Sequence, residues 1–180
     1  MKKSLIILSA MLFAFTTAAF SQEQLAEKRA ACKADAFPER YFHYTLRGSL
    51  ANSYIKFSRG GKARVAFLGG SITEMWGWKN QIEEFFKATF PQTEFEFVEA
   101  GIPSMGSTPH SFRMKTDVLS KGKIDLLFVE AGPNDDTNEF TPIEQVRGME
   151  GMVRQAWLAD AETDIIMLHF IWDGFINIHK

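Results

Sequence analysis

The feature that most constrains this chain is an alternation, beginning near residue 62, of apolar runs of strand length with longer amphipathic segments. The expected strands are residues 64–68, 95–99, 124–130 and 165–170, and the expected helices are residues 78–90, 112–120 and 143–159. Such alternation is typical of βαβ units, in which helices cover both faces of a parallel sheet. It predicts a three-layer α/β fold.

Proline and glycine mark the ends of the expected helices. Pro91 closes the first helix and Gly122 the second, while Thr141 and Pro142 open the third as N-cap and first-turn proline. Near-helical apolar spacings also predict a helix over residues 41–57, ahead of the sheet.

The first 21 residues have the pattern of a secretory signal peptide. Lys2 and Lys3 precede an apolar run over residues 5–20, which is short of the roughly 20 apolar residues that a spanning helix needs. Ser21 closes a small-x-small cleavage signal. We expect a mature chain that begins near Gln22 and is secreted or periplasmic, without stable membrane insertion; a retained anchor is the alternative.

Two regions follow the signal peptide: a leader and helix over residues 22–60, and the α/β domain over residues 61–180. Cys32 is the only cysteine, so no intrachain disulfide is expected. A net charge of −2 gives no electrostatic footprint for nucleic acid. No group of His, Cys or Asp residues has metal-ligand spacing, and we expect neither a metal nor a cofactor.

The polar residues that follow the first three strands carry the chemistry. Ser71 follows the first strand, Gly101 the second and Asn134 the third. Because parallel strands end at one edge of the sheet, we expect the three residues to surround one small void there. A serine hydroxyl is a nucleophile for acyl transfer. Two backbone N–H groups, of Ser71 and Gly101, and the carboxamide of Asn134 are suitable donors to an oxyanion.

At these positions the chain resembles the SGNH (GDSL-like) hydrolases. Gly69-Gly70-Ser71-Ile72-Thr73 is similar to the family's Gly-Asp-Ser-Leu block, in a form seen in many carbohydrate-associated members. Gly132-Pro133-Asn134-Asp135 is similar to its Gly-x-Asn-Asp block, and Gly101 lies between them, in the place of the glycine block. The resemblance covers roughly residues 62–170. It implies a flavodoxin-like three-layer fold and a serine esterase that acts on a small acylated substrate, such as an acetylated carbohydrate.

Two departures from the family pattern affect the expected activity. Gly70 replaces the aspartate of the first block, and no aspartate is followed three residues later by a histidine, so the Asp-x-x-His block that supplies the general base is missing. Of the four histidines, His43 precedes the sheet, and His110 is expected in the loop after Gly101. His169 is a candidate for the base, but a structural role is expected for it. His179 is the other candidate, but it is a loose penultimate residue without an aspartate partner at the family spacing, and neither is assigned as catalytic. We predict weak or absent esterase activity.

Other functions fit parts of the same pattern. Singly, Ser71 suits a helix N-cap, Gly101 a turn and Asn134 an Asx-turn. A non-catalytic relic or binding module would keep the oxyanion pocket for a carboxylate or a sugar. A flavodoxin-like carrier would share the layers, but Glu74 brings negative charge to the turn that would have to hold a phosphate.

The sequence after the fourth strand stops where the family continues with a further helix and strand, so we expect a truncated member that lacks this last strand and helix. The fourth strand, residues 165–170, is then an exposed apolar edge. Such an edge is a template for pairing with another chain. We expect poor solubility or self-association.

Five further residues lie near the predicted site. Trp76 and Trp78 either wall an acyl or sugar pocket or, as we favour, pack in the core. Glu74, Asp136 and Glu139 fit the placement of negative charge at helix N-termini, which requires no function.

Overall fold

A computed structural model describes residues 47–170 of the chain. In chain order the elements are α2 (Ala51–Arg59), β1 (Gly61–Gly69), α3 (Ser71–Glu74), α4 (Trp78–Thr89), β2 (Thr93–Gly101), α5 (Ser107–Asp117), the 3-10 turn η2 (Leu119–Lys121), β3 (Leu126–Glu130), α6 (Gly132–Thr137), α7 (Pro142–Ala159) and β4 (Asp164–Leu168). The predicted signal peptide, Cys32, His43 and His179 lie outside the described residues.

The four strands form one parallel sheet in the order β2-β1-β3-β4. The chain therefore starts near the middle of the sheet, moves to one edge with β2, and returns past β1 to β3 and β4. In the register, Gly69 at the end of β1 lies beside Gly101 at the end of β2. All four predicted strands form, and the predicted α/β fold with a parallel sheet is confirmed.

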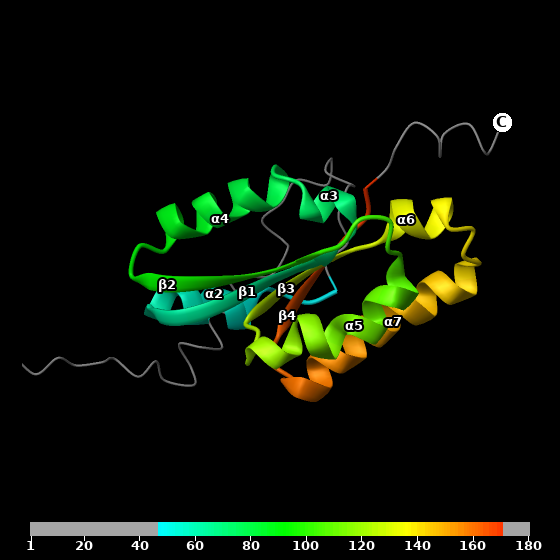
Figure 1. Ribbon diagram of the computed structural model, residues 1–180. Coiled ribbons are helices and arrows are strands. Elements are labelled where there is room, and N and C mark those ends of the chain that lie inside the picture. Colours follow the sequence, from blue (N-terminus) through cyan, green and yellow to red (C-terminus); the bar gives the residue numbers. More distant parts are fainter. Residues whose placement is uncertain (1–46, 171–180) are drawn as a thin grey trace, which may run out of the picture.

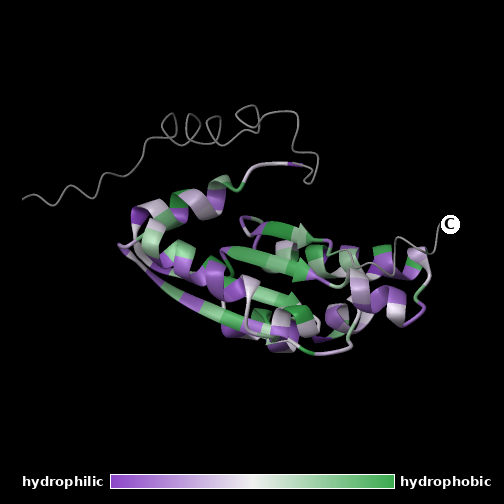
Figure 2. Cartoon of the chain, turned by 90° about the horizontal axis from the view of Figure 1, so that it is seen from above, coloured by the Kyte–Doolittle hydropathy of each residue, from purple (hydrophilic) through white to green (hydrophobic). Residues whose placement is uncertain are grey.

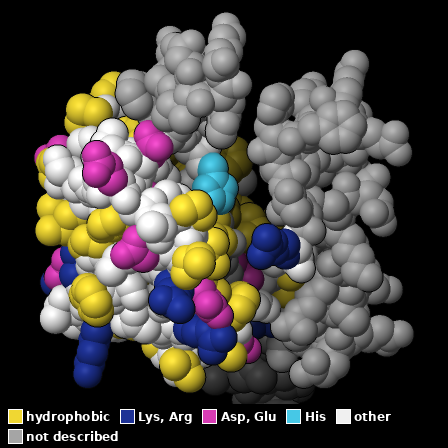
Figure 3. All heavy atoms as spheres, turned by 90° about the vertical axis from the view of Figure 1, so that its right-hand side faces the viewer, with side chains coloured by type: hydrophobic (Ala, Val, Ile, Leu, Met, Phe, Trp, Pro, Cys, Tyr) yellow, Lys and Arg dark blue, Asp and Glu magenta, His cyan; other side chains and the backbone are white. Residues whose placement is uncertain are grey.

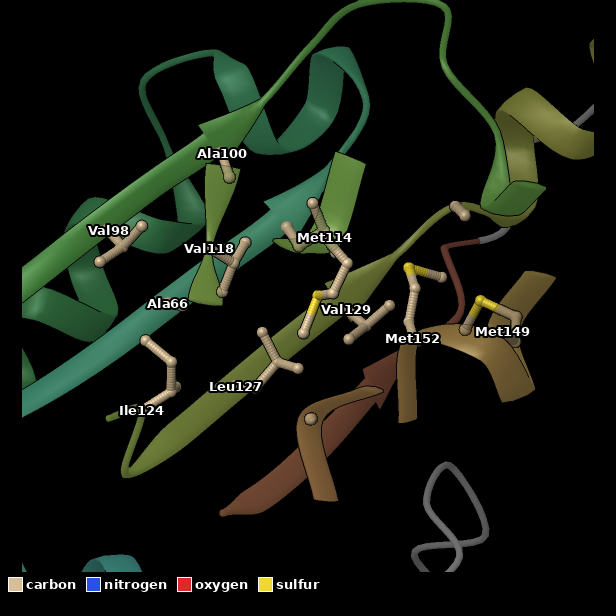
Figure 4. Close-up of a cluster of buried hydrophobic side chains, with 13 residues drawn as sticks. Ala66, Val98, Ala100, Met114, Val118, Ile124, Leu127, Val129, Met149 and Met152 are labelled. Carbon is tan, nitrogen blue, oxygen red and sulfur yellow. The ribbon is translucent and has the colours of Figure 1, made fainter. Parts of the chain in front are cut away.

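Helices cover both faces of this sheet (Figure 1). On one face, α5 and α7 bury a cluster that includes Met114 and Met152 against Leu68 and Leu127 (Figure 4). On the other face, α2 and α4 contribute Phe57 and Phe86 to an aromatic cluster with the strand phenylalanines.

Strand composition follows from position in the sheet. All five residues of β3 are buried, and β1 is buried from Val65 onward, because helices lie on both sides of these strands. In contrast, β2 alternates between exposed and half-buried residues over most of its length, as an edge strand does. In Figure 2 the middle of the sheet is coloured hydrophobic and the surrounding helices carry the hydrophilic residues.

Two predicted helices differ from the structure at their ends. The helix predicted over residues 41–57 begins at Ala51 in the described part, and residues 47–50 are not helical. The second domain helix, predicted to begin at residue 112, begins at Ser107. Its first turn buries Ser107 and His110 rather than apolar side chains, so it has no apolar period by which a sequence pattern detects a helix.

The start of α7 confirms the predicted cap. Thr141 is the N-cap, and its hydroxyl accepts a hydrogen bond from the Glu144 N–H at 3.3 Å. The Glu144 carboxylate accepts in return from the Thr141 N–H at 2.8 Å. This reciprocal capping box, with Pro142 in the first turn, fixes where the helix begins. None of the helices within residues 47–170 is long and apolar enough to span a membrane.

Candidate active site

The predicted site residues lie where three neighbouring strands end. Ser71 follows the central strand β1, Gly101 ends β2 on one side of it, and Asn134 follows β3 on the other side. All three residues are half-buried, so each is partly accessible to solvent. Figure 3 views the molecule from the side where the strands end, and there hydrophobic side chains are interspersed with carboxylates and cations.

Ser71 is the first residue of the short helix α3. The N-cap is Gly70, in an extended conformation, and it makes no side-chain capping bond. The alternative interpretation of Ser71 as an N-cap serine is therefore wrong. The first N–H groups of a helix have no acceptor within that helix, so Ser71 offers a backbone donor as well as its hydroxyl.

Gly101 lies directly against the backbone of α3. A Cβ added there would lie 2.5 Å from the Glu74 Cα and 2.8 Å from the Thr73 carbonyl carbon. These are backbone atoms and cannot turn aside, so any larger residue at this position would push α3 away from β2. The Ile102 N–H donates to the Gly69 carbonyl at 2.9 Å, which keeps the chain beyond Gly101 beside the Ser71 turn.

Asn134 lies in α6, and its carboxamide points at the Ser71 turn. A Cβ added to Gly70 would collide with Nδ2 of Asn134, and Cγ would be 3.1 Å away. The Asn134 side chain thus reaches across to the turn after β1. In an Asx-turn it would instead fold onto its own backbone. The structure therefore brings the hydroxyl-bearing turn and the carboxamide together.

Two buried carboxylates, Glu130 and Asp135, hold these segments in place. The sequence analysis assigned a role to neither, although Asp135 ends the Gly-x-Asn-Asp block. Glu130, 1% exposed, accepts from the Gly70 N–H and the Thr73 hydroxyl, each at 3.0 Å. Asp135, also 1% exposed, accepts from the Ser107 N–H at 2.6 Å and the Ser107 hydroxyl at 3.0 Å. Burial raises the pKa of the Asp135 carboxyl, and the Ser107 hydrogen bonds act in the opposite direction.

Arg113 of α5 ties together the ends of β1 and β2. Its guanidinium donates to the carbonyl oxygens of Ala100 and, at 3.4 Å, Gly69. It also pairs with Asp117 at 2.8 Å. Arg113 therefore fixes the strand ends that precede Ser71 and Gly101.

His110 is not in a loop, as the sequence analysis expected, but in α5 and fully buried. Its Nδ1 accepts a hydrogen bond from Nε of Arg113 at 3.0 Å, and its Nε2 has no partner among residues 47–170. Burial, reinforced by the charge of Arg113, lowers the pKa of His110 to about 3. The imidazole is consequently neutral and makes no hydrogen bond to Ser71.

His169 is exposed and follows β4, at the same edge of the sheet as Ser71. Neither His110 nor His169 is therefore assigned as the general base. His43 and His179 lie outside the described residues.

The other residues singled out near the site have mixed outcomes. Trp78 packs in the core, with its ring 5.4 Å from that of Phe67, whereas Trp76 is 81% exposed. Glu74 lies in the first turn of α3, as expected. The expectation is wrong for Asp136, which lies beyond the first turn of α6, and for Glu139, which lies between helices.

Two hollows in the structure lie away from this edge. One of about 390 Å³ is lined by Lys56, Lys62, Arg64 and neighbouring residues at the opposite end of β1. Another of about 360 Å³ lies between α5 and α7. The void expected among Ser71, Gly101 and Asn134 stays a prediction. Within residues 47–170 no group of three or more His, Cys, Asp or Glu side chains is arranged to hold a metal ion.

Comparison with known proteins identifies the class of fold. No protein-family model and no curated protein matches the chain. Among solved structures, it is similar to a two-domain esterase (CEX) active on acetylated mannans, at 30% identity and a TM-score of 0.58, over 68% of this chain and 34% of that one. The same esterase with mannopentaose gives 29% identity and the same TM-score, over 64% and 32%. TesA matches at 17% identity and a TM-score of 0.53, over 64% and 65%.

These neighbours establish the fold as that of the SGNH hydrolases: a parallel sheet between layers of helices. The chain spans about a third of the length of the mannan esterase, 34% in the longer match.

Proposed function

We propose that the chain carries the nucleophile and the oxyanion donors of a serine esterase site, with Ser71 as nucleophile and the Ser71 N–H, Gly101 N–H and Asn134 carboxamide as donors. The observation that carries the proposal is the contact of Asn134 Nδ2 with the Gly70 position, immediately before Ser71. It is supported by the similarity to an esterase at 30% identity.

The reaction we propose is acyl transfer. The Ser71 Oγ attacks the ester carbonyl carbon and gives its proton to a base, and the alcohol leaves with a proton when the tetrahedral intermediate collapses. Water then releases the acid from the serine. The donors act where negative charge develops, on the carbonyl oxygen, so their contribution is greater in the transition state than in the ground state.

We further propose a small acyl ester of a carbohydrate, such as an acetate, as the substrate, and secretion as the destination. The first rests on the neighbour active on acetylated mannans and on the Gly-Gly-Ser-Ile-Thr motif. The second rests on the basic start and apolar run of residues 1–21.

Hydrolysis of p-nitrophenyl acetate by the purified mature chain tests this function. We expect slow turnover, because no described histidine is bonded to Ser71, and loss of turnover to the uncatalysed level in Ser71→Ala. Ser120→Ala, at an exposed serine remote from the three strand ends, is the matched control and should retain the wild-type rate. Equal rates in Ser71→Ala and the wild type would refute the nucleophile.

A second function is favoured by the position of His110. This histidine is buried and its Nδ1 is bonded to Arg113, so it is not the base. Without a base, the same hydrogen-bond donors could bind a carboxylate or a sugar and catalyse no reaction. Acetate-induced thermal stabilisation that Asn134→Ala abolishes, in a chain without Ser71-dependent turnover, would establish this binding function.

A further inference from the structure

Glu130 is a buried carboxylate whose hydrogen bonds all go to the turn that carries Ser71. It ends β3, is 1% exposed, and uses Oε2 to accept from the Gly70 N–H and the Thr73 hydroxyl. Its other oxygen, Oε1, is buried and has no partner among the described residues. Burying a carboxylate is unfavourable unless hydrogen bonds compensate for the lost water, so a side chain kept only for packing would be apolar here.

The surrounding residues leave room for this carboxylate. A Cβ at Gly69 would lie 2.7 Å from Oε2 of Glu130 and would also collide with the Thr73 hydroxyl. Glycine is therefore required at position 69 because the Glu130 carboxylate, from the neighbouring strand, approaches the backbone there.

We propose that Glu130 is a positioning residue for the nucleophile. By holding the Gly70 N–H and the Thr73 side chain on both sides of Ser71, it fixes the start of α3, and with it the direction of the Ser71 hydroxyl and N–H. One oxygen of Glu130 accepts both hydrogen bonds. An amide has a single accepting oxygen and a donor NH₂ group, so it can hold this turn in only one of its two orientations. The inference rests on the proposed function of Ser71 and adds to it the group that orients the nucleophile.

The chain offers a matched control at the opposite end of the sheet. Asp164, at the start of β4, is 8% exposed, and its Oδ2 accepts from the Ser53 N–H and the Ser53 hydroxyl, each at 2.7 Å. Both carboxylates accept a backbone N–H and a hydroxyl, and Asp164 is hydrogen-bonded by Asn52 as well. Only Glu130 touches the Ser71 turn. A loss of function that merely reflects lost stability will appear in variants of both residues.

The test measures Ser71-dependent turnover of p-nitrophenyl acetate, with kcat and KM separated, beside thermal melting. For Glu130→Gln we expect a loss of roughly 10-fold in kcat at unchanged KM, and for Glu130→Leu roughly 100-fold, the scale of small misplacements in an active site. Thr73→Val, which removes one donor, should lose kcat by a few-fold. Asp164→Asn should lower the melting temperature and leave kcat within about threefold of the wild type.

The outcomes separate the two proposals. A wild-type rate in Glu130→Gln and Thr73→Val, or a loss of kcat in Asp164→Asn equal to that in Glu130→Gln, would overturn the positioning role alone. Absence of any Ser71-dependent turnover in the wild type would overturn the proposed function, and the positioning role with it. Should Glu130→Leu fail to fold, the Gln and Thr73→Val variants still decide the question.

Discussion

At the scale of single residues, the candidate site depends on three positions where a side chain is absent. Gly69 admits the Glu130 carboxylate, Gly70 admits the Asn134 carboxamide, and Gly101 admits the backbone of α3. An added side chain would meet different atoms at these positions. At Gly70 it would meet the end of the flexible Asn134 side chain, whereas at Gly101 it would meet main-chain atoms that cannot move aside. Activity and stability should therefore separate at Gly70.

For Gly70→Ala we expect the added methyl group to displace the Asn134 carboxamide while the fold adapts by rotating that side chain. Removing one oxyanion donor lowers turnover by about 10²- to 10³-fold, so Ser71-dependent hydrolysis should fall on that scale with little change in melting temperature. Gly132→Ala, where no atom lies within 4 Å of an added Cβ, is the control. Equal turnover in the two variants would show that Asn134 is not a donor.

At the scale of elements, apolar residues predicted all four described strands. The central strands β1 and β3 are nearly uniform in composition because helices cover both of their faces, whereas the edge strand β2 alternates. The order of the polar residues after them then placed Ser71, Gly101 and Asn134 at one edge. The sequence did not reveal the buried carboxylate that holds the Ser71 turn in place. Glu130 bonds residues 57 and 60 positions away, and a single carboxylate after an apolar run gives no sign of such a partner. The start of α5 was missed because its first turn is polar but buried.

The buried histidine of α5 predicts a pH dependence of stability. Its folded-state pKa of about 3 lies below the ordinary 6.5, so the unfolded chain binds the proton first as pH falls. The stability that depends on a neutral His110 is fully present above pH 6.5 and is lost as pH falls toward 3. The free energy of unfolding should fall by up to about 1.4 kcal/mol per pH unit in this range.

Urea unfolding of the wild type and His110→Gln at several pH values from about 7 to 5 measures this slope. The difference in unfolding free energy between the two proteins should shrink toward acid pH. Burial raises the pKa of Asp135 and Asp164, which acts in the opposite direction, but these groups are common to both proteins. His169→Gln, at an exposed site, should follow the wild type. Parallel curves for the wild type and His110→Gln would contradict a buried neutral imidazole.

At the scale of the whole molecule, the sheet ends in β4 on one side within the described residues. Its Ile165, Ile166 and Leu168 are half-buried and Met167 is 37% exposed. An apolar edge strand with unpaired backbone groups favours pairing with another chain. Self-association through β4 stays a prediction.

We expect light scattering to show a mass that increases with concentration, and Met167→Lys to shift it toward the monomer because a charge on an edge strand opposes pairing. Val146→Lys, on the exposed side of α7, is the matched control and should not change the mass. A monodisperse monomer at high concentration would contradict association through β4.

The central claim is that Ser71, Gly101 and Asn134 act on one reacting group. The most direct test is a crystal structure of the mature chain after reaction with diethyl p-nitrophenyl phosphate, whose phosphoryl oxygen mimics the oxyanion. The account predicts phosphorus bonded to the Ser71 Oγ, with that oxygen at roughly 3 Å from the Ser71 N, the Gly101 N and Asn134 Nδ2. An adduct on another residue, or a phosphoryl oxygen directed away from Gly101 and Asn134, would contradict it.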